Sequence, residues 1–305
     1  MRLAMIGLGK MGGNMARRLR GGEIEVVGYD NDPAVTAALA DESGLVPAAS
    51  LADVVAKLDA PRVVWMMLPA GAITENTVNE LAGQLSPGDI LVDGGNANFH
   101  DSMRRGEAMA ERSLHFVDAG VSGGVWGLKE GYAMMIGGND SAMETLRPAL
   151  EVLAPGKDKG WMHTGPVGSG HYVKMVHNGI EYGMMQAYAE GLALLRSRDD
   201  FNLDLSEVTE MWRHGSVVRS WLLDLTAEFL AADQSLEDTA PFVADSGEGR
   251  WTAIEAIEQG IPTPVMSTAI MARFSSQGKQ DYTSKLLAKM RQAFGGHALK
   301  SSGDG

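Results

Sequence analysis

Reactive side chains gather in one stretch of this sequence, residues 165–182. Five of them follow the helical spacing i, i+3, i+4, i+7 and i+8, namely Lys174, His177, Asn178, Glu181 and Tyr182. A helix turns about 100° per residue, so this spacing places all five on one face. The opposite face is apolar, with Val173, Val176, Ile180 and Met184. We therefore predict a helix with a buried apolar back and a polar face that lines a pocket. A solvated stripe with a Lys/Glu pair is the alternative.

Lys174 and Glu181 suit acid and base chemistry. An amine and a carboxyl group titrate on opposite sides of neutral pH, and burial shifts both pKa values toward neutrality. A neutral lysine can take a proton from a hydroxyl group, and a protonated carboxyl group can give one to carbon. The spacing leaves the substrate open.

The composition limits the kinds of protein that can hold such a helix. At 305 residues the chain is longer than most single domains, so two domains are expected. The absence of cysteine excludes disulfides and thiolate chemistry, and it is compatible with a reducing cytoplasm. The formal net charge of −13 argues against binding to nucleic acid or to an anionic membrane, because such surfaces need basic patches. We expect no bound metal.

The start of the chain does not resemble a targeting segment. It carries one basic side chain, Arg2, before a short apolar run that Gly7 and Gly9 interrupt. This run is too short for the apolar part of a signal peptide, and nowhere do about 18 apolar residues follow one another. We expect a soluble, cytoplasmic protein.

A strand, a glycine turn and a helix open the chain, with the strand at residues 3–6 and the helical pattern at residues 14–19. This order is the context that a dinucleotide-binding fingerprint requires, with the pyrophosphate at the N-terminus of the helix. The first glycine permits a tight turn, the second lets the pyrophosphate approach, and the third lets the helix pack closely on the strand. We predict a Rossmann-type domain whose cofactor-binding turn consists of Gly7, Leu8, Gly9, Lys10, Met11 and Gly12.

Asp30 follows the second predicted strand, residues 25–29, where this fold places the residue that meets the adenosine ribose. A carboxylate there accepts hydrogen bonds from both ribose hydroxyls and repels the 2′-phosphate of NADP. Asn31 and Asp32 come next, and no arginine is near to hold that phosphate. We predict NAD as the cofactor, with NADP disfavoured. The alternative is an ordinary turn at the end of a strand.

Further buried strands are predicted at residues 63–68, 90–93 and 115–118. Ligands of an open α/β sheet bind beyond the carboxyl ends of its strands, so the loops that follow are candidate pocket segments. For any one of these residues taken alone, ordinary turn chemistry is the favoured explanation. The candidates are Leu68 and Gly71 for the cofactor, Asn96 for cofactor and substrate, and Ser122, Gly123 and Gly124 for the substrate.

Strand patterns end after residues 133–136 and 161–163, and helical patterns replace them. The helical segments are 183–196, 205–231, 250–260 and 264–275. We predict an α/β dinucleotide-binding domain at residues 1–163 and an all-α domain for substrate binding and oligomerisation at residues 164–305. Residues 301–305 are expected to form a loose tail.

Together these stretches resemble the β-hydroxyacid dehydrogenase family, and within it the 6-phosphogluconate dehydrogenases, over essentially the whole chain. The resemblance rests on the glycine fingerprint, residues 118–124, and the run from Gly165 through Lys174 and Asn178. The narrower resemblance rests on residues 93–96, on His177, Glu181 and Tyr182, and on residues 291–297. The segment around Arg273 is similar as well.

The resemblance implies oxidative decarboxylation of 6-phospho-D-gluconate to D-ribulose 5-phosphate and CO2, with reduction of a nicotinamide cofactor. It implies that neutral Lys174 takes the proton of the C3 hydroxyl and later stabilises the enolate, and that Glu181 protonates C1. It also implies that the sugar acid and its phosphate are held by Asn96, Ser122, Gly123, Gly124, His177, Asn178, Tyr182, Arg273, Arg291 and His297.

This sequence departs from the longer members of that family in two ways. It has a single copy of the helical half, so we expect an intertwined homo-oligomer, a dimer or a tetramer, in which Arg291 and His297 enter the neighbouring active site. The loop before Trp251 also lacks the phosphate-binding lysine, and Arg250 is our candidate replacement.

Two other functions compete with this one. A dehydrogenase of a small β-hydroxyacid, such as hydroxyisobutyrate, would share Lys174 but would not need Arg273, Arg291 and His297. A non-catalytic NAD(H)-binding protein would have no use for both Lys174 and Glu181.

Overall fold

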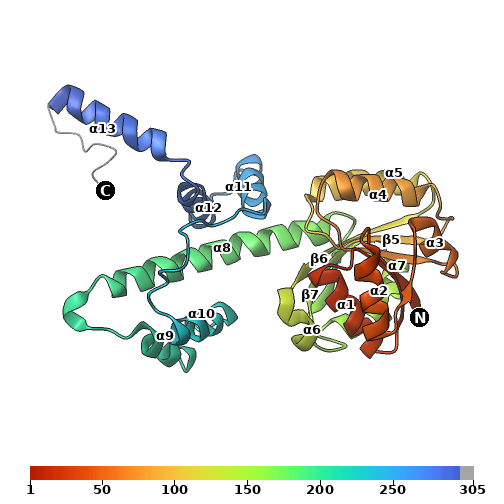
Figure 1. Ribbon diagram of the computed structural model, residues 1–305. Helices are drawn as coiled ribbons and strands as arrows, with labels where there is room; N and C mark the ends of the chain where they lie inside the picture. The colour runs from red at the N-terminus through yellow and green to blue at the C-terminus, as the bar shows by residue number, and fades with distance from the viewer. Residues whose placement is uncertain (296–305) are drawn as a thin grey trace. The chain divides into compact units, whose positions relative to one another are not determined.

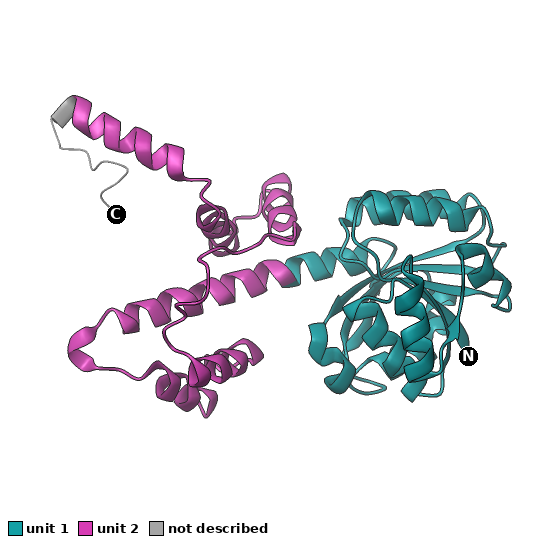
Figure 2. Ribbon diagram, in the orientation of Figure 1, with its two compact units in different colours: residues 1–177 teal, residues 178–305 magenta. Residues whose placement is uncertain are grey.

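The computed structural model describes residues 1–295 and divides into two compact units (Figure 2). The first comprises Met1–His177 and the second begins at Asn178. The division falls inside one helix, α8 (Ser169–Arg196). Our domain boundary at residue 163 stays a prediction. Because His297 and the tail at 301–305 lie outside the described residues, the expectations for them stay predictions too.

The first unit is built on one sheet of eight strands in the order β3-β2-β1-β4-β5-β6-β7-β8. Every neighbouring pair is parallel except β6 and β7. All seven predicted strands are confirmed. The eighth, β3, escaped prediction because it is two residues long and contains a proline. The strands are β1 (Arg2–Ile6), β2 (Glu25–Tyr29), β3 (Val46–Pro47), β4 (Val63–Met66), β5 (Ile90–Asp93), β6 (His115–Ser122), β7 (Ala133–Gly137) and β8 (Trp161–Gly165).

Helices cover both faces of this sheet (Figure 1). Successive side chains along a strand point to opposite faces of the sheet, so they pack in two separate hydrophobic cores. Leu3 and Met5 belong to one core, and Ala4 and Ile6 belong to the other. The first core includes α1 (Lys10–Gly21), α2 (Pro33–Ser43) and α7 (Asp140–Leu153). The second includes α3 (Leu51–Ala56), α4 (Ala72–Ala82) and α5 (Phe99–Ala110). Burial on both faces explains why the strands are continuous apolar runs.

The second unit is helical, as predicted. After α8 come α9 (Leu205–Arg213), α10 (Trp221–Ala232), α11 (Glu248–Glu258), α12 (Pro264–Ser276) and α13 (Asp281–Gly295). The prediction of one continuous helix over 205–231 is wrong, because α9 ends at Arg213. Gly215 adopts a positive φ of 83° there, and Ser220 caps the start of α10. Helix α13 was not predicted.

Burial along α8 differs from the prediction. The polar face is the buried one, since Lys174 is 5% exposed and Asn178 and Tyr182 are each 7% exposed. On the apolar back, Ile180 is 52% exposed and Met184 is 39% exposed. The prediction of a buried apolar back is therefore wrong for the single chain, because the described part of the second unit places no core against it.

Among residues 1–295, no helix is both long and apolar enough to span a membrane.

Candidate active site

The predicted cofactor residues lie at one edge of the sheet. Strands β2, β1, β4, β5 and β6 are parallel neighbours, so the loops that follow them emerge on the same side. The direction of chain progression reverses between β1 and β4, because β2 lies on one side of β1 and β4 on the other. Such a switch point is where open α/β sheets form a crevice for ligands.

The glycine turn is shaped for close backbone packing and for an open approach. A Cβ atom on Gly12 would lie 1.9 Å from the carbonyl oxygen of Gly7, so only glycine lets α1 start this close to β1. A Cβ atom on Gly9 would meet no atom within 4 Å. Gly9 precedes the first residue of α1, where unpaired N–H groups and the helix dipole favour an anion. The turn therefore fits a pyrophosphate.

Asp30 lies beside this turn. Its Oδ2 accepts a hydrogen bond of 2.7 Å from the amide of Leu8, and its Oδ1 accepts one of 3.0 Å from the amide of Asp32. Each carboxylate oxygen has a second lone pair, so Asp30 retains the capacity to accept from ribose hydroxyls. The side chain of Leu8 is part of the core, and its amide serves Asp30. Lys10 is exposed and Met11 packs on the core.

The loops after β4 and β5 are packed together. A Cβ atom on Gly95 would lie 2.4 Å from the carbonyl oxygen of Leu68, and one on Gly7 would lie 2.9 Å from the Leu68 side chain. Gly71 has a φ of 102° and precedes α4. Asn96 is exposed within the loop after β5. The structure therefore brings the glycine turn, Leu68 and the loop of Asn96 together.

A buried ionic network supports the loop of Asn96. The Oδ2 atom of Asp93 lies 3.0 Å from a guanidinium nitrogen of Arg105, and its Oδ1 accepts from the amide of Gly95. Arg105 also contacts Glu75 at 2.9 Å. Burial raises the pKa of Asp93 to about 6, although the charge of Arg105 acts in the opposite direction. Two arginines, chiefly Arg104, lower the pKa of Glu75 to about 2.

Ser122 ends β6, and Gly123 and Gly124 follow it with positive φ values of 128° and 52°. Arg18 of α1 links the residues that follow Gly124 to this helix. Its guanidinium donates hydrogen bonds to the carbonyl oxygens of Leu128 and Ala154. The segment that follows the three predicted substrate groups is therefore held against α1.

Asp118 of β6 holds the beginning of α8. Its two carboxylate oxygens accept hydrogen bonds from the amides of Gly168 at 2.6 Å and His171 at 2.7 Å. A carboxylate at a helix N-terminus satisfies N–H groups that have no partner inside the helix. Burial raises the pKa of Asp118 to about 6, and these hydrogen bonds limit the rise.

Lys174 lies against the same strand. A Cβ atom on Gly120 would be 2.3 Å from the Cβ of Lys174 and 2.9 Å from the carbonyl oxygen of Gly170. Glycine at position 120 therefore lets the first turns of α8 touch β6. Nearby, Nδ1 of the buried His171 lies 2.7 Å from the hydroxyl of Ser102, and burial lowers the pKa of His171 to about 4.

In the second unit, α8 continues into a second polar cluster. The Nδ2 atom of Asn178 donates to the carboxylate of Glu248, and the hydroxyl of Ser246 donates to the same carboxylate oxygen at 3.0 Å. The hydroxyl of Tyr182 lies 2.9 Å from that of Ser246. Arg273 stacks over the Tyr182 ring at 3.5 Å. Three predicted substrate residues are thus connected here.

The remaining predicted residues lie on α8, α11 and α13. His177 and Glu181 are half-buried on the same face of α8 as Lys174, in agreement with the helical spacing. Arg291 is exposed on α13. Arg250, our candidate for the missing lysine, pairs with the carboxylate of Asp245 and lies over the ring of Phe274.

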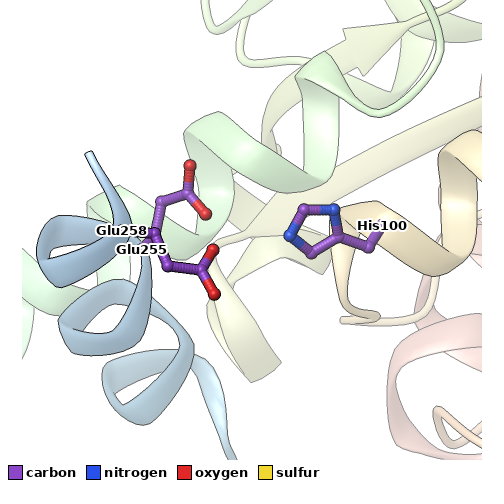
Figure 3. A group of neighbouring side chains, drawn as sticks. All are labelled: His100, Glu255 and Glu258. Carbon is purple, nitrogen blue, oxygen red and sulfur yellow. The ribbon is translucent and has the colours of Figure 1, made fainter.

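Figure 3 shows two carboxylates of α11, Glu255 and Glu258, together with His100, which belongs to α5 in the other unit. The two glutamates by themselves provide too few ligands for a metal centre. We infer no metal site from them.

Sequence reasoning assigned no role to Asp118, Arg105 or Glu248. Asp93 ends β5 and Asp118 lies within β6, so each is a carboxylate among buried apolar residues, and both belong to the stretches that carry the family resemblance. Glu248 lies in the polar segment just before Trp251, but its partner Asn178 is 70 residues away in the chain. No spacing rule connects the two.

The glycine turn and Asp30 at the switch point place this chain among the dinucleotide-binding oxidoreductases, and its helical second unit narrows that class. Residues 2–165 match the model of the NAD binding domain of 6-phosphogluconate dehydrogenase, and residues 170–302 match the model of the C-terminal domain of the same enzyme. The chain belongs to the 6-phosphogluconate dehydrogenase family.

Individual relatives agree with this assignment. A Haloferax volcanii protein named NAD(+)-dependent, decarboxylating 6-phosphogluconate dehydrogenase is 41% identical over 305 residues, which cover 100% of each chain. The 6-phosphogluconate dehydrogenase of Plasmodium falciparum, solved in its apo form, with NADP+ and with 6-phosphogluconate, superposes with a TM-score of 0.84 at 29% identity. The match covers 100% of this chain and 67% of the Plasmodium chain.

A 3-hydroxyisobutyrate dehydrogenase from Salmonella typhimurium has a TM-score of 0.75 at 22% identity, with 92% of this chain and 95% of that chain covered. At this identity the likeness shows a shared fold and carries no argument about the substrate.

Proposed function

We propose that this chain catalyses the oxidative decarboxylation of 6-phospho-D-gluconate to D-ribulose 5-phosphate and CO2 with NAD. The observation that carries the proposal is the placement of Lys174, which is buried and lies against β6 on the helix that also bears Glu181. The names and the full-length match of the relatives support the same reaction.

The cofactor, when bound, supplies the hydride acceptor. Lys174 takes the proton of the C3 hydroxyl as C3 is oxidised, and its ammonium group then stabilises the negative charge that develops when the 3-keto acid loses CO2. Glu181 gives a proton to C1 of the enediol that remains. The new keto group is the electron sink for decarboxylation, so this scheme requires no metal.

The other predicted residues bind and orient. Gly7 to Gly12 and Asp30 hold the dinucleotide, together with Leu68, Gly71 and Asn96. Asn96, Ser122, Gly123, Gly124, His177 and Asn178 hold the sugar acid, and Tyr182 and Arg273 hold its phosphate. Arg291 and His297 complete the phosphate site of a neighbouring subunit in a homo-oligomer.

The experiment that tests the proposal is the initial rate of absorbance gain at 340 nm with 6-phosphogluconate, measured in parallel with NAD and NADP. We expect a fast rate with NAD and a slow one with NADP. A fast rate with NADP alone would keep the reaction and contradict the preference for NAD. Absence of a rate with both cofactors, combined with activity on hydroxyisobutyrate, would favour the small-hydroxyacid alternative.

Asp30 is the residue on which the preference for NAD depends. Replacing it with Ala removes the repulsion of the 2′-phosphate and the acceptor for the ribose, so kcat/KM should rise for NADP and fall for NAD. The ratio of the two should change by at least about tenfold, which corresponds to about 1.4 kcal/mol. Asp41→Ala on the exposed surface of α2 is the matched control. An unchanged ratio would remove Asp30 from cofactor selection.

A further inference from the structure

Glu248 is a buried carboxylate to which the proposed mechanism assigns no role. It is 3% exposed and is the first residue of α11, directly after Gly247. A negative charge in the first turn of a helix is stabilised by the helix dipole and by the N–H groups there. A buried carboxylate nevertheless needs hydrogen-bond donors, and here both of the described donors come from side chains around the predicted substrate site.

The first donor is Asn178 of α8. Its Nδ2 group donates to Oε2 of Glu248. An ionised carboxylate can only accept hydrogen bonds, so the amide has to turn its NH2 group toward Glu248. The two ends of an Asn amide are otherwise hard to tell apart, and this contact selects one orientation. The carbonyl oxygen of Asn178 therefore faces away from Glu248.

The second donor is Ser246. Its hydroxyl gives its one proton to the same Oε2 atom at 3.0 Å, so it accepts a hydrogen bond from Tyr182 at 2.9 Å. The chain of donors thus runs from Tyr182 through Ser246 to Glu248. Its direction is fixed at the carboxylate end, because the single hydroxyl proton of Ser246 is donated to Glu248.

We propose that Glu248 is a positioning residue for the dehydrogenase reaction. It holds the amide of Asn178 so that the carbonyl oxygen accepts a hydrogen bond from a hydroxyl group of the substrate. This inference rests on the proposed function, in which Asn178 binds the sugar acid. An acceptor in this position favours a hydroxyl donor and disfavours carboxylate or phosphate oxygens, so Glu248 also helps to set the orientation of an anionic sugar.

The test compares three variants of the full-length enzyme with the wild type. Glu248→Ala should raise KM for 6-phosphogluconate by about tenfold, as expected for an amide that loses its orienting hydrogen bond. KM for NAD should not change. Glu248→Gln keeps an oxygen that accepts from both donors, so its KM should stay within about threefold of the wild type. Glu258→Ala removes an exposed carboxylate from the same helix and should match the wild type.

A double-mutant cycle with Asn178→Ala separates positioning from a general structural role. If Glu248 acts through Asn178, adding Glu248→Ala to Asn178→Ala should raise KM no further. An equal rise in both backgrounds would overturn the inference, and so would a Glu248→Gln enzyme as impaired as Glu248→Ala. A wild-type enzyme inactive toward 6-phosphogluconate would instead overturn the proposed function, and this inference with it.

Discussion

Lys174 and Glu181 belong to successive steps of the proposed reaction, and single-turnover kinetics can separate them. Lys174→Met removes the base that starts the oxidation, so NADH formation should slow by about 10²-fold or more even in the first turnover. Glu181→Gln removes the acid that acts after CO2 has left. Its first turnover should still produce NADH, while its steady-state rate falls by a similar factor.

Rapid-mixing absorbance at 340 nm makes this comparison, and binding of NADH followed by fluorescence controls for the integrity of the first unit. A burst of NADH in Lys174→Met, or none in Glu181→Gln, would contradict the order of steps assigned to the two residues.

Asp118 should make the stability of the first unit depend on pH. Its folded pKa of about 6 is raised above its ordinary value of 3.8, so the folded state binds more protons than the unfolded state between these pH values. The resulting stabilisation is complete below about pH 3.8 and is lost as the pH rises through about 6. For a shift of this size the loss is at most about 3 kcal/mol.

Asp118→Asn removes this contribution. The free energy of unfolding of the wild type minus that of the variant should therefore decrease from pH 4.5 to pH 7, as measured by urea denaturation. The charge of Asp118 also raises the pKa of Asp93. Asp118→Asn removes that effect as well, which makes the same difference in unfolding free energy decrease further as the pH rises. A difference that increases with pH would mean that the folded pKa of Asp118 is lowered.

At the scale of elements, β5 and α5 are joined by the ion pair of Asp93 with Arg105, whose side chains are 0% and 2% exposed. Arg105→Met leaves the buried Asp93 without its charge partner, which typically costs 3–5 kcal/mol. We expect a corresponding loss in the free energy of unfolding, measured by denaturation in urea.

The double variant Asp93→Asn with Arg105→Met should recover part of that loss, because it leaves no buried charge unpaired. Additive losses from the two substitutions would show that the ion pair is not what joins these two elements.

The sequence alone predicts much of the element order. The physical reasons for this success also explain which elements the sequence does not predict. Strands buried on both faces are apolar runs, so β1, β4 and β5 are recognisable without any partner. The break between α9 and α10 is not, because a single glycine is compatible with a helix interior as well as a helix end, and only the structure shows that Gly215 has a positive φ. Likewise, a spacing of three and four residues predicts the shared face of Lys174 and Asn178, but not which face is buried.

In the candidate site, too, local patterns are predictable from the sequence and long-range contacts are not. The glycine turn is a local pattern, and Asp30 lies beside it, where its carboxylate accepts a hydrogen bond from the amide of Leu8. Their roles in cofactor binding stay predictions. The contacts that hold α8 are not local, since Asp118 is 50 residues from Gly168 in the chain. Only the folded sheet brings such residues together.

At the scale of the whole molecule, the second unit exposes large apolar side chains. Val217 is 98% exposed, Ile257 is 81% exposed and Tyr282 of α13 is 76% exposed. Exposed apolar surface of this kind is typical of an interface that is covered by another chain. It supports the proposed homo-oligomer, in which Arg291 would serve a neighbouring site.

Mixing two inactive variants tests that shared site. Lys174→Met and Arg291→Ala should each be nearly inactive alone. If Arg291 acts in the partner's site, a mixed dimer has one site with both residues intact. After subunit exchange in equal amounts, half of the dimers are mixed and half of their sites are complete, so activity should recover to about a quarter of the wild type. No recovery in mixed dimers, identified by two different tags, would mean that Arg291 serves its own chain.

The anchoring of α8 on Asp118 determines where this chain can be joined to another. The amides of Gly168 and His171, and the close approach of Lys174 to Gly120, depend on a strand of the first unit. A chimera spliced near residue 163 would ask a foreign helix start to fit this strand. A chimera spliced after His177 carries the strand and its helix start together, so exchange of cofactor preference between relatives is best attempted at that junction.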